Sequence, residues 1–160
     1  MVKAAITLPL ISAGGIATGS AMLAAAALGA DGVQVGSRFV ASDEASSHPN
    51  FKNEVVRAVD GSTVLTLKEI TPVRMLKNSF FQKIAALYEG GTDVEELKTT
   101  LGRGRAKKGM FEGDLEEGEL EIGQIAGLIN EVIPASQIID NFIEEYDQAL
   151  KNLKVIYCDP

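Results

Sequence analysis

Short apolar runs between glycines open the chain and alternate with one alanine-rich stretch. Leu8–Ser12 is apolar and stops just before Gly14 and Gly15, and Gly32–Gly36 is a second β-branched run bounded by glycines. Continuous apolar runs of this length are typical of buried parallel strands. The stretch between them, Ser20–Leu28, is rich in alanine and leucine and favours a helix. The opening third therefore predicts strand, helix and strand, a βαβ unit with a right-handed crossover.

In the rest of the chain, apolar residues recur mostly at helical spacing. Thr18 is placed as the N-cap of the first helix and Gly29 as its C′ glycine, while Pro49 can occupy the first turn of a second helix that ends at Asp60-Gly61. Thr92 is a suitable cap for a later one. The expected elements after Pro49 are a helix with Phe51, Val55, Val56 and Val59 on its apolar face, a strand at Thr63–Leu67, helices at Arg74–Tyr88, Val94–Leu101 and Ile122–Asn130, and a last helix from Pro134 carrying Ile138, Ile139, Phe142, Ile143, Tyr146, Leu150 and Leu153 at core-facing spacing.

Two segments lack such a pattern. Gly102–Gly123 holds many glycines and charges but few apolar residues, so we expect a long irregular segment that could serve as an active-site lid. Val155–Pro160 has no assignable structure. The acidic residues of the first segment lack the spacing of a calcium loop and are interpreted as solvated loop charge: Asp114, Glu116, Glu117, Glu119 and Glu121.

Composition narrows the function classes. The chain has 160 residues, 46% of them hydrophobic, which suits one compact domain, and its net charge of −7 argues against nucleic-acid binding. Cys158 is the only cysteine, so neither an internal disulfide nor a Cys/His metal site is expected, in keeping with a reducing cytoplasm. No apolar run reaches the roughly 18 residues of a membrane span, so a soluble, cytoplasmic protein is expected.

The two glycine-bearing turns carry the strongest indication of chemistry. Ala13-Gly14-Gly15-Ile16 follows the first strand, and Gly36-Ser37-Arg38-Phe39 follows the second. The carboxyl ends of parallel strands lie on one face of a sheet, so the two turns should be neighbours that offer backbone N–H groups to a phosphate. Arg38 could neutralise charge or pair structurally. The alternative is that the glycines only make tight turns.

Longer stretches resemble a known family. LISAGGIATGSAMLAAAALGADGVQVGSRFVAS is similar to the end of the FMN barrel shared by nitronate monooxygenases (2-nitropropane dioxygenases) and flavin-dependent enoyl-acyl-carrier-protein reductases, class II. SSHPNFKNEVVRA, TPVRMLKN, EGDLEEGELEIGQIAGLI and the closing helix resemble the enoyl-reductase branch, so the resemblance runs to near Leu153. It implies an α/β fold, the C-terminal portion of a (β/α)₈ TIM barrel with strands 7 and 8 and an inserted helical lobe.

A complete barrel of this kind needs about 250 residues, so the resemblance implies that the N-terminal barrel half lies outside this chain. The expected organisation is the end of the FMN-binding barrel at 1–42, the helical lobe and lid-like loop at 43–121, closing barrel helices at 122–154 and a tail at 155–160. The oligomeric state is left open, and a homodimer is one alternative. A half-barrel on its own would leave open strand edges and an uncovered apolar face.

The resemblance also implies site residues. FMN-contact positions of the family fall on Gly14, Gly15, Gln34, Gly36 and Ser37. The family's catalytic histidine lies upstream, so no catalytic residue is expected in this segment and no metal ligand is assigned. His48 is interpreted as a surface or capping histidine, and Arg74 and Asn78, which match family positions, as structural residues.

Two further groups of residues are candidates with open alternatives. Gly123 and Gln124 match a stretch near the flavin side or substrate, or else the glycines only let a helix pack closely while Gln124 is exposed. A basic cluster could contact the extra phosphate of NADPH or an acidic carrier protein, or be solvated loop charge: Arg103, Arg105, Lys107 and Lys108.

The expected activity is that of an FMN-dependent oxidoreductase. The preferred reaction is reduction of enoyl-acyl-carrier-protein thioesters in fatty acid biosynthesis with NADPH or NADH as the reductant. One alternative is nitronate monooxygenase activity on a small nitronate, because both reactions use the flavin as redox centre. Another is a non-catalytic module that binds a phosphate-bearing ligand.

Overall fold

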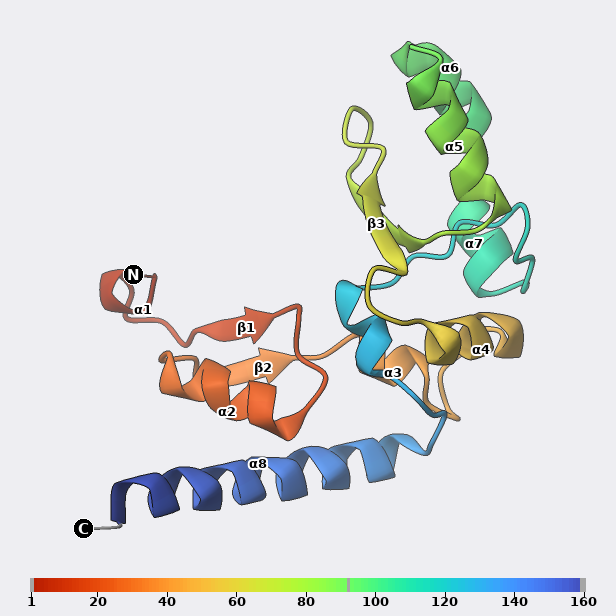
Figure 1. The fold of residues 1–160 in the computed structure, drawn as a ribbon. Coiled ribbons are helices and arrows are strands. Elements are labelled where there is room, and N and C mark those ends of the chain that lie inside the picture. The colour runs from red at the N-terminus through yellow and green to blue at the C-terminus, as the bar shows by residue number, and fades with distance from the viewer. Residues whose placement is uncertain (1, 92, 159–160) are drawn as a thin grey trace.

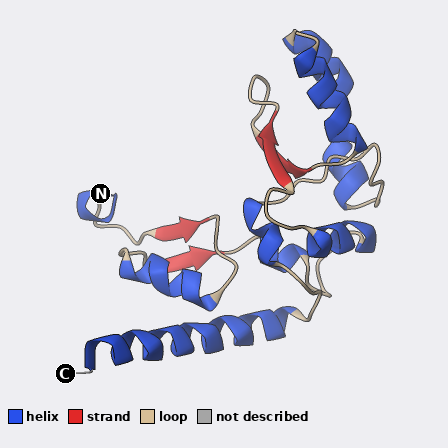
Figure 2. Ribbon diagram, in the orientation of Figure 1, coloured by secondary structure: helices blue, strands red, loops and turns tan. Residues whose placement is uncertain are grey.

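The computed structural model describes residues 2–91 and 93–158. The chain forms a layered part, with a short parallel sheet and two helices, and a lobe of hairpin and helices beside it (Figure 1; Figure 2). In chain order the elements are α1 Val2–Ala5, β1 Ile11–Ala13, α2 Gly19–Ala27, β2 Gly32–Gln34, α3 Ser37–Val40, α4 Pro49–Arg57, β3 Thr63–Thr66, β4 Val73–Leu76, α5 Ser79–Glu89, α6 Val94–Leu101, α7 Arg105–Met110, the 3₁₀ helix η1 Gln124–Leu128 and α8 Ala135–Cys158.

The predicted βαβ unit is confirmed. β1 and β2 pair in parallel, and α2 connects them with the Thr18 side chain as its N-cap and Gly29 following at φ +98°. The first strand begins later than expected because Pro9 has no N–H to give to a ladder. Leu10 is held instead by Asp31, whose carboxylate accepts from the Leu10 N–H at 2.8 Å.

The longest helix, α8, packs along α2 (Figure 1). Ile138 and Phe142 of α8 are buried with Ile16 in one apolar cluster. The expectation that Ile139 and Ile143 face a core is wrong in this chain, since they are 50% and 54% exposed. Leu153 is likewise exposed, and the helix continues to Cys158, into a segment for which the sequence predicts no structure.

A central cluster joins the layered part to the lobe. It contains residues from the end of α3, from α4, from the end of β4 and from the segment around η1: Ala41, Phe51, Val55, Ala58, Leu76, Leu120, Ile122, Ile125, Ala126 and Ile129. Pro49 stands in the first turn of α4, as predicted, but the helix ends at Arg57 because Ala58 is extended at ψ 141°. Val59 is therefore not on its apolar face and is exposed. The expected α-helix at Ile122–Asn130 is instead the shorter η1.

The lobe contains an antiparallel hairpin that the sequence pattern did not predict in full. β3 was expected, but Arg74 to Leu76 belong to β4 and not to a helix, because they pair with Thr63 to Leu65 across the hairpin. The helix starts later, at Ser79, where the Asn78 side chain accepts from the Phe81 N–H at 3.0 Å. Asp93 caps α6, while the cap predicted at Thr92 lies outside the described residues.

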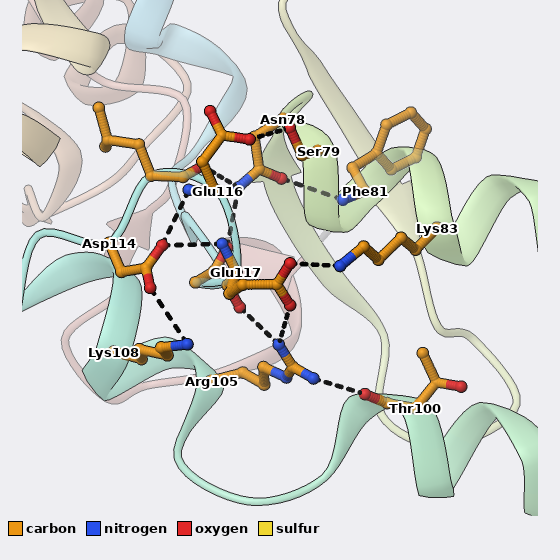
Figure 3. Close-up of polar contacts among 12 residues, drawn as sticks. Asn78, Ser79, Phe81, Lys83, Thr100, Arg105, Lys108, Asp114, Glu116 and Glu117 are labelled. Carbon is orange, nitrogen blue, oxygen red and sulfur yellow. Dashed lines mark hydrogen bonds and ion pairs between the residues drawn. The ribbon is translucent and has the colours of Figure 1, made fainter.

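The segment expected to be irregular is partly helical and fastened to the lobe. It contains α7, and Arg105 in that helix bonds to the Glu117 carboxylate and backbone (Figure 3). The Arg105 guanidinium also lies over the Phe80 ring, 4.8 Å from the ring centroid. Asn78 donates to the carbonyls of Leu115 and Gly118 at 2.7 and 2.9 Å. The glycine-rich composition reflects close packing, since Gly109 and Gly118 are in direct contact. The assignment of this segment as a lid stays a prediction.

Within the described residues, no helix combines the length and apolar character needed to cross a bilayer. Over the same residues, no three His, Cys, Asp or Glu side chains are grouped as metal ligands would be.

Candidate functional site

The two glycine corners are neighbours. Ala13 and Gln34, the last residues of β1 and β2, are directly opposite each other in the parallel register. Gly14 and Gly15 follow at φ +87° and +75°, in the left-handed region that favours glycine. A Cβ atom added at Gly14, Gly15 or Gly36 would meet no atom within 4 Å. The space beside both corners is therefore not filled by side chains, so backbone N–H groups there can approach an anion.

Ser37 connects the second corner to a distant part of the chain. Its Oγ accepts from the Gly123 N–H at 3.1 Å, and a Cβ on Gly123 would lie only 2.7 Å from that oxygen. A hydroxyl that accepts one hydrogen bond keeps its own proton to donate. Ser37 can thus be held in place by Gly123 while donating to a bound anion.

An extended stretch brings Gly123 to this corner. Leu76 donates to the Leu120 carbonyl at 2.9 Å and Ile122 donates to the Arg74 carbonyl at 3.0 Å, which adds this stretch to the edge of β4. Gln124 follows, exposed at the start of η1. The structure therefore places Gly123, but not the Gln124 side chain, in contact with a predicted phosphate-site residue.

Arg38 has structural partners. It is buried, with an exposed fraction of 8%, and its guanidinium donates to the Ala41 and Glu131 carbonyls at 3.4 and 3.3 Å. Burial lowers the pKa of the guanidinium, and the Glu131 carboxylate opposes that shift. Of the two alternatives for this side chain, structural pairing is the one that the contacts support.

The start of α2 already holds an anionic group. The Glu145 carboxylate of α8 accepts from the Gly19 N–H at 2.7 Å, and Thr18 accepts from Ala21 at 3.1 Å. A carboxylate at a helix N-terminus neutralises the partial positive charge there. A phosphate beside the two corners would therefore depend on the loop N–H groups of Gly14 and Gly15 and not on the end of this helix.

His48 caps a helix, as expected from its position before Pro49. Its Nδ1 accepts from the Asn50 N–H at 3.1 Å, and the ring lies against Gly113. This use of the imidazole explains the residue without a catalytic role.

Three members of the basic cluster are paired with carboxylates of the same lobe. Arg105 pairs with Glu117 at 3.0 Å, Lys107 with Glu112 at 3.1 Å and Lys108 with Asp114 at 3.1 Å. Lys83 also reaches Glu117 (Figure 3). Arg103 is exposed. These pairs give the cluster a structural role, and its contact with NADPH or a carrier protein stays a prediction.

Glu119 is a residue whose setting sequence analysis missed. It is only 7% exposed, and burial together with the nearby Glu121 raises the pKa of its carboxyl group to about 7, against an opposing effect of Arg105. Burial also raises the pKa of Glu121. Both side chains were interpreted as solvated because they stand in an acidic run. Alternation with buried Leu120 and Ile122 is the pattern that could have revealed an extended, packed segment.

Replacing Gly123 with alanine is expected to displace Ser37, because the new Cβ would overlap its Oγ. Overpacking of this kind costs about 1–3 kcal/mol of unfolding free energy. Ser37→Ala removes the hydroxyl without adding bulk and should cost about 1 kcal/mol. Denaturant unfolding of both variants measures the difference; equal stabilities would show that the corner yields without strain.

Comparisons with known proteins show the family to which this chain belongs. The profile described as "Nitronate monooxygenase" matches residues 1–145, so the chain belongs to the nitronate monooxygenase family. A probable nitronate monooxygenase of Staphylococcus saprophyticus is 28% identical over 91% of this chain and 41% of its own length.

Solved structures of two similar proteins share the architecture of this chain. FabK from Thermotoga maritima is 39% identical with a TM-score of 0.86, over 97% of this chain and 49% of that one. A nitroalkane oxidase from Streptomyces ansochromogenes is 29% identical with a TM-score of 0.72, over 95% and 43% of the two chains. This chain thus spans less than half of the length of these relatives and corresponds to their C-terminal part. The α/β fold predicted from sequence is confirmed.

Proposed function

We propose that this chain supplies the phosphate-binding half of an FMN site in an oxidoreductase. The observation that carries the proposal is the pair of adjacent glycine corners with open space beside them. The residues that would hold the phosphate and its ribityl side are Gly14, Gly15, Gln34, Gly36 and Ser37. β1 and β2 would then be strands 7 and 8 of a (β/α)₈ barrel, with 43–121 as the inserted lobe and 122–154 as the closing segment.

The residues present suit this cofactor. Glycines at positive φ let the backbone approach a dianionic group without a Cβ to hold it away. The Ser37 hydroxyl, oriented by Gly123, adds a donor. FMN would supply a flavin ring that accepts hydride from NADPH or NADH and passes reducing equivalents to the substrate. The task of this chain would be to bind and orient the cofactor, while the N-terminal barrel half would carry the catalytic histidine.

Enoyl-acyl-carrier-protein thioester reduction in cytoplasmic fatty acid synthesis is the reaction that we favour. It is supported by the higher identity to FabK, 39%, than to the nitroalkane oxidase, 29%. Nitronate oxidation is the second candidate, because the matching family profile and the curated relatives bear that name. Assays of NADPH and NADH oxidation with a crotonyl thioester and with a nitronate, on the chain co-expressed with an N-terminal half, separate them. Turnover of the nitronate alone would reject the favoured reaction.

Gly15→Val tests the phosphate site directly. A side chain there would occupy the space proposed for the phosphate, and the expected result is a loss of FMN affinity of roughly tenfold or more, measured by quenching of flavin fluorescence. Gly91→Val is the matched control, since Gly91 also has positive φ, +72°, and no atom within 4 Å of an added Cβ, but lies in the lobe. Equal FMN affinities of the two variants would overturn the proposal.

A further inference from the structure

Two buried cations hold the turn that follows α3. Lys52 of α4 is only 8% exposed, and its ammonium group donates to the Ser42 and Asp43 carbonyls at 2.5 and 3.3 Å. Arg38 of α3 donates to the Ala41 carbonyl at 3.4 Å. Cationic side chains from two helices therefore bind the carbonyls of three consecutive residues, and the backbone of this turn is fixed from both sides.

The buried position of Lys52 needs a compensating role. Removing an ammonium group from water costs free energy unless the group is paired. The two carbonyls that Lys52 binds belong to the main chain, so this side chain fixes the course of the backbone. Replacing Lys52 with methionine, which has a similar length and no donor, would leave both carbonyls without the ammonium group.

α3 connects this turn to the second glycine corner. The helix has only four residues, and so short a helix has little stability of its own. At its start the Gly36 carbonyl accepts from the Phe39 and Val40 N–H groups at 2.9 and 3.2 Å. In a trans peptide the C=O and the following N–H point in opposite directions, so this arrangement directs the Ser37 N–H away from α3. The orientation of that donor therefore depends on α3 staying folded.

We propose that Lys52 is a positioning residue for the cofactor phosphate. By holding the end of α3, it keeps the Ser37 N–H and hydroxyl where the proposed phosphate site needs them. Lys52 acts through the main chain and not by contact with the cofactor. The inference rests on the proposed function for the identity of the ligand. It adds a residue of α4, outside both glycine corners, on which the affinity for phosphate depends.

Riboflavin separates this role from a general contribution to stability. It has the ring and the ribityl chain of FMN but lacks the phosphate, so the loss of a phosphate donor weakens the binding of FMN alone. We expect Lys52→Met to lower the affinity for FMN roughly tenfold and to leave that for riboflavin within about twofold, both measured by quenching of flavin fluorescence. Lys52→Gln keeps an uncharged donor and is the milder second variant, with the same pattern and a smaller loss.

Asn78→Leu is the matched control. Asn78 also donates to two main-chain carbonyls, those of Leu115 and Gly118, but it lies in the lobe. The substitution should lower the stability of the chain without changing the ratio of its affinities for FMN and riboflavin.

Hydrogen exchange of the chain without ligand gives a second measurement. The amides of Phe39 and Val40, which bond to the Gly36 carbonyl, report whether α3 is folded. Mass spectrometry should find that these amides exchange faster in Lys52→Met than in the wild-type chain, and at the wild-type rate in Asn78→Leu.

Three results would overturn the inference. They are equal FMN affinities of Lys52→Met and the control, a loss of affinity in Lys52→Met that is as large for riboflavin as for FMN, and unchanged exchange at Phe39 and Val40. Each of them would leave the proposed function standing, provided that the wild-type chain binds FMN. A wild-type chain that does not bind FMN is a separate result, which would overturn the proposed function and this inference with it.

Discussion

Replacing Gly19 with alanine is expected to force α2 away from α8 and to lower the free energy of unfolding by about 3 kcal/mol. A Cβ at this position would collide with the Phe142 carbonyl oxygen and the Tyr146 backbone nitrogen of α8. Backbone atoms inside a helix cannot turn aside as a flexible side chain can. The displacement would also break the bond from the Gly19 N–H to Glu145, which fixes the start of α2.

The helix propensities of glycine and alanine make the result of this substitution easy to interpret. In a helix, alanine is normally more favourable than glycine by about 1 kcal/mol, so a loss of stability can come only from the contact between the helices. Gly90→Ala is the control, because Gly90 ends α5 with its nearest neighbour at 3.4 Å from an added Cβ. Denaturant unfolding of both variants gives the comparison. A Gly19→Ala protein as stable as the control would mean that the helices do not touch there.

The second large effect is a loss of stability between about pH 4.5 and about pH 7 that depends on Glu119. The pKa of its carboxyl group is raised from the ordinary 4.5 to about 7 in the folded protein, chiefly by burial and then by Glu121. A raised folded pKa means that the protonated acid is favoured by folding. The folded state is therefore progressively penalised as pH rises from about 4.5 to about 7, and the full penalty applies above that range.

Glu119→Gln should remove this penalty. A shift of this size corresponds to ~3 kcal/mol, and because the carboxyl group is only partly desolvated we expect a gain of about 2 kcal/mol for the variant near pH 8. Unfolding free energies from about pH 5 to about pH 8 measure it. The wild-type curve should fall over this range and the variant curve should be flatter.

Glu117→Gln is the control for that experiment. Its carboxylate bonds to Lys83 and Arg105, which hold its pKa below the usual value, so its removal should not change the slope of stability between about pH 6 and about pH 8. Parallel curves for Glu119→Gln and the wild-type protein would contradict the assignment of the raised pKa.

Local sequence patterns predicted the elements that depend on local interactions. The Thr18 cap and the position of Pro49 in the first turn of α4 require only neighbours in the chain, and the βαβ unit pairs two strands separated by a single helix. The β3–β4 hairpin was half missed because the helical spacing of Arg74 and its neighbours competes with pairing to Thr63–Leu65, which only the tertiary structure decides. The prediction for Ile139 and Ile143 of α8 was wrong because helical spacing alone does not show which apolar side chains find a partner, and both stay exposed.

The candidate site was likewise predicted only in part from the sequence. The glycine corners were found because short turns after strands leave a pattern in the sequence, and parallel pairing then brings them together. The bond between Ser37 and Gly123 joins residues 86 positions apart, so no spacing rule could indicate it. Glu119 was missed because an acidic run conceals which of its members alternate with buried residues.

The stretch from Leu120 to Gly123 has a mechanical consequence. It is bonded to β4 at two points and to Ser37 at a third, so the inner end of the lobe is tied to the second glycine corner. A rigid-body rotation of the whole lobe would displace Gly123 and, through the hydrogen bond between them, Ser37. Movements that do not disturb Ser37 are thereby restricted to the outer end of the lobe, where α5 and α6 meet.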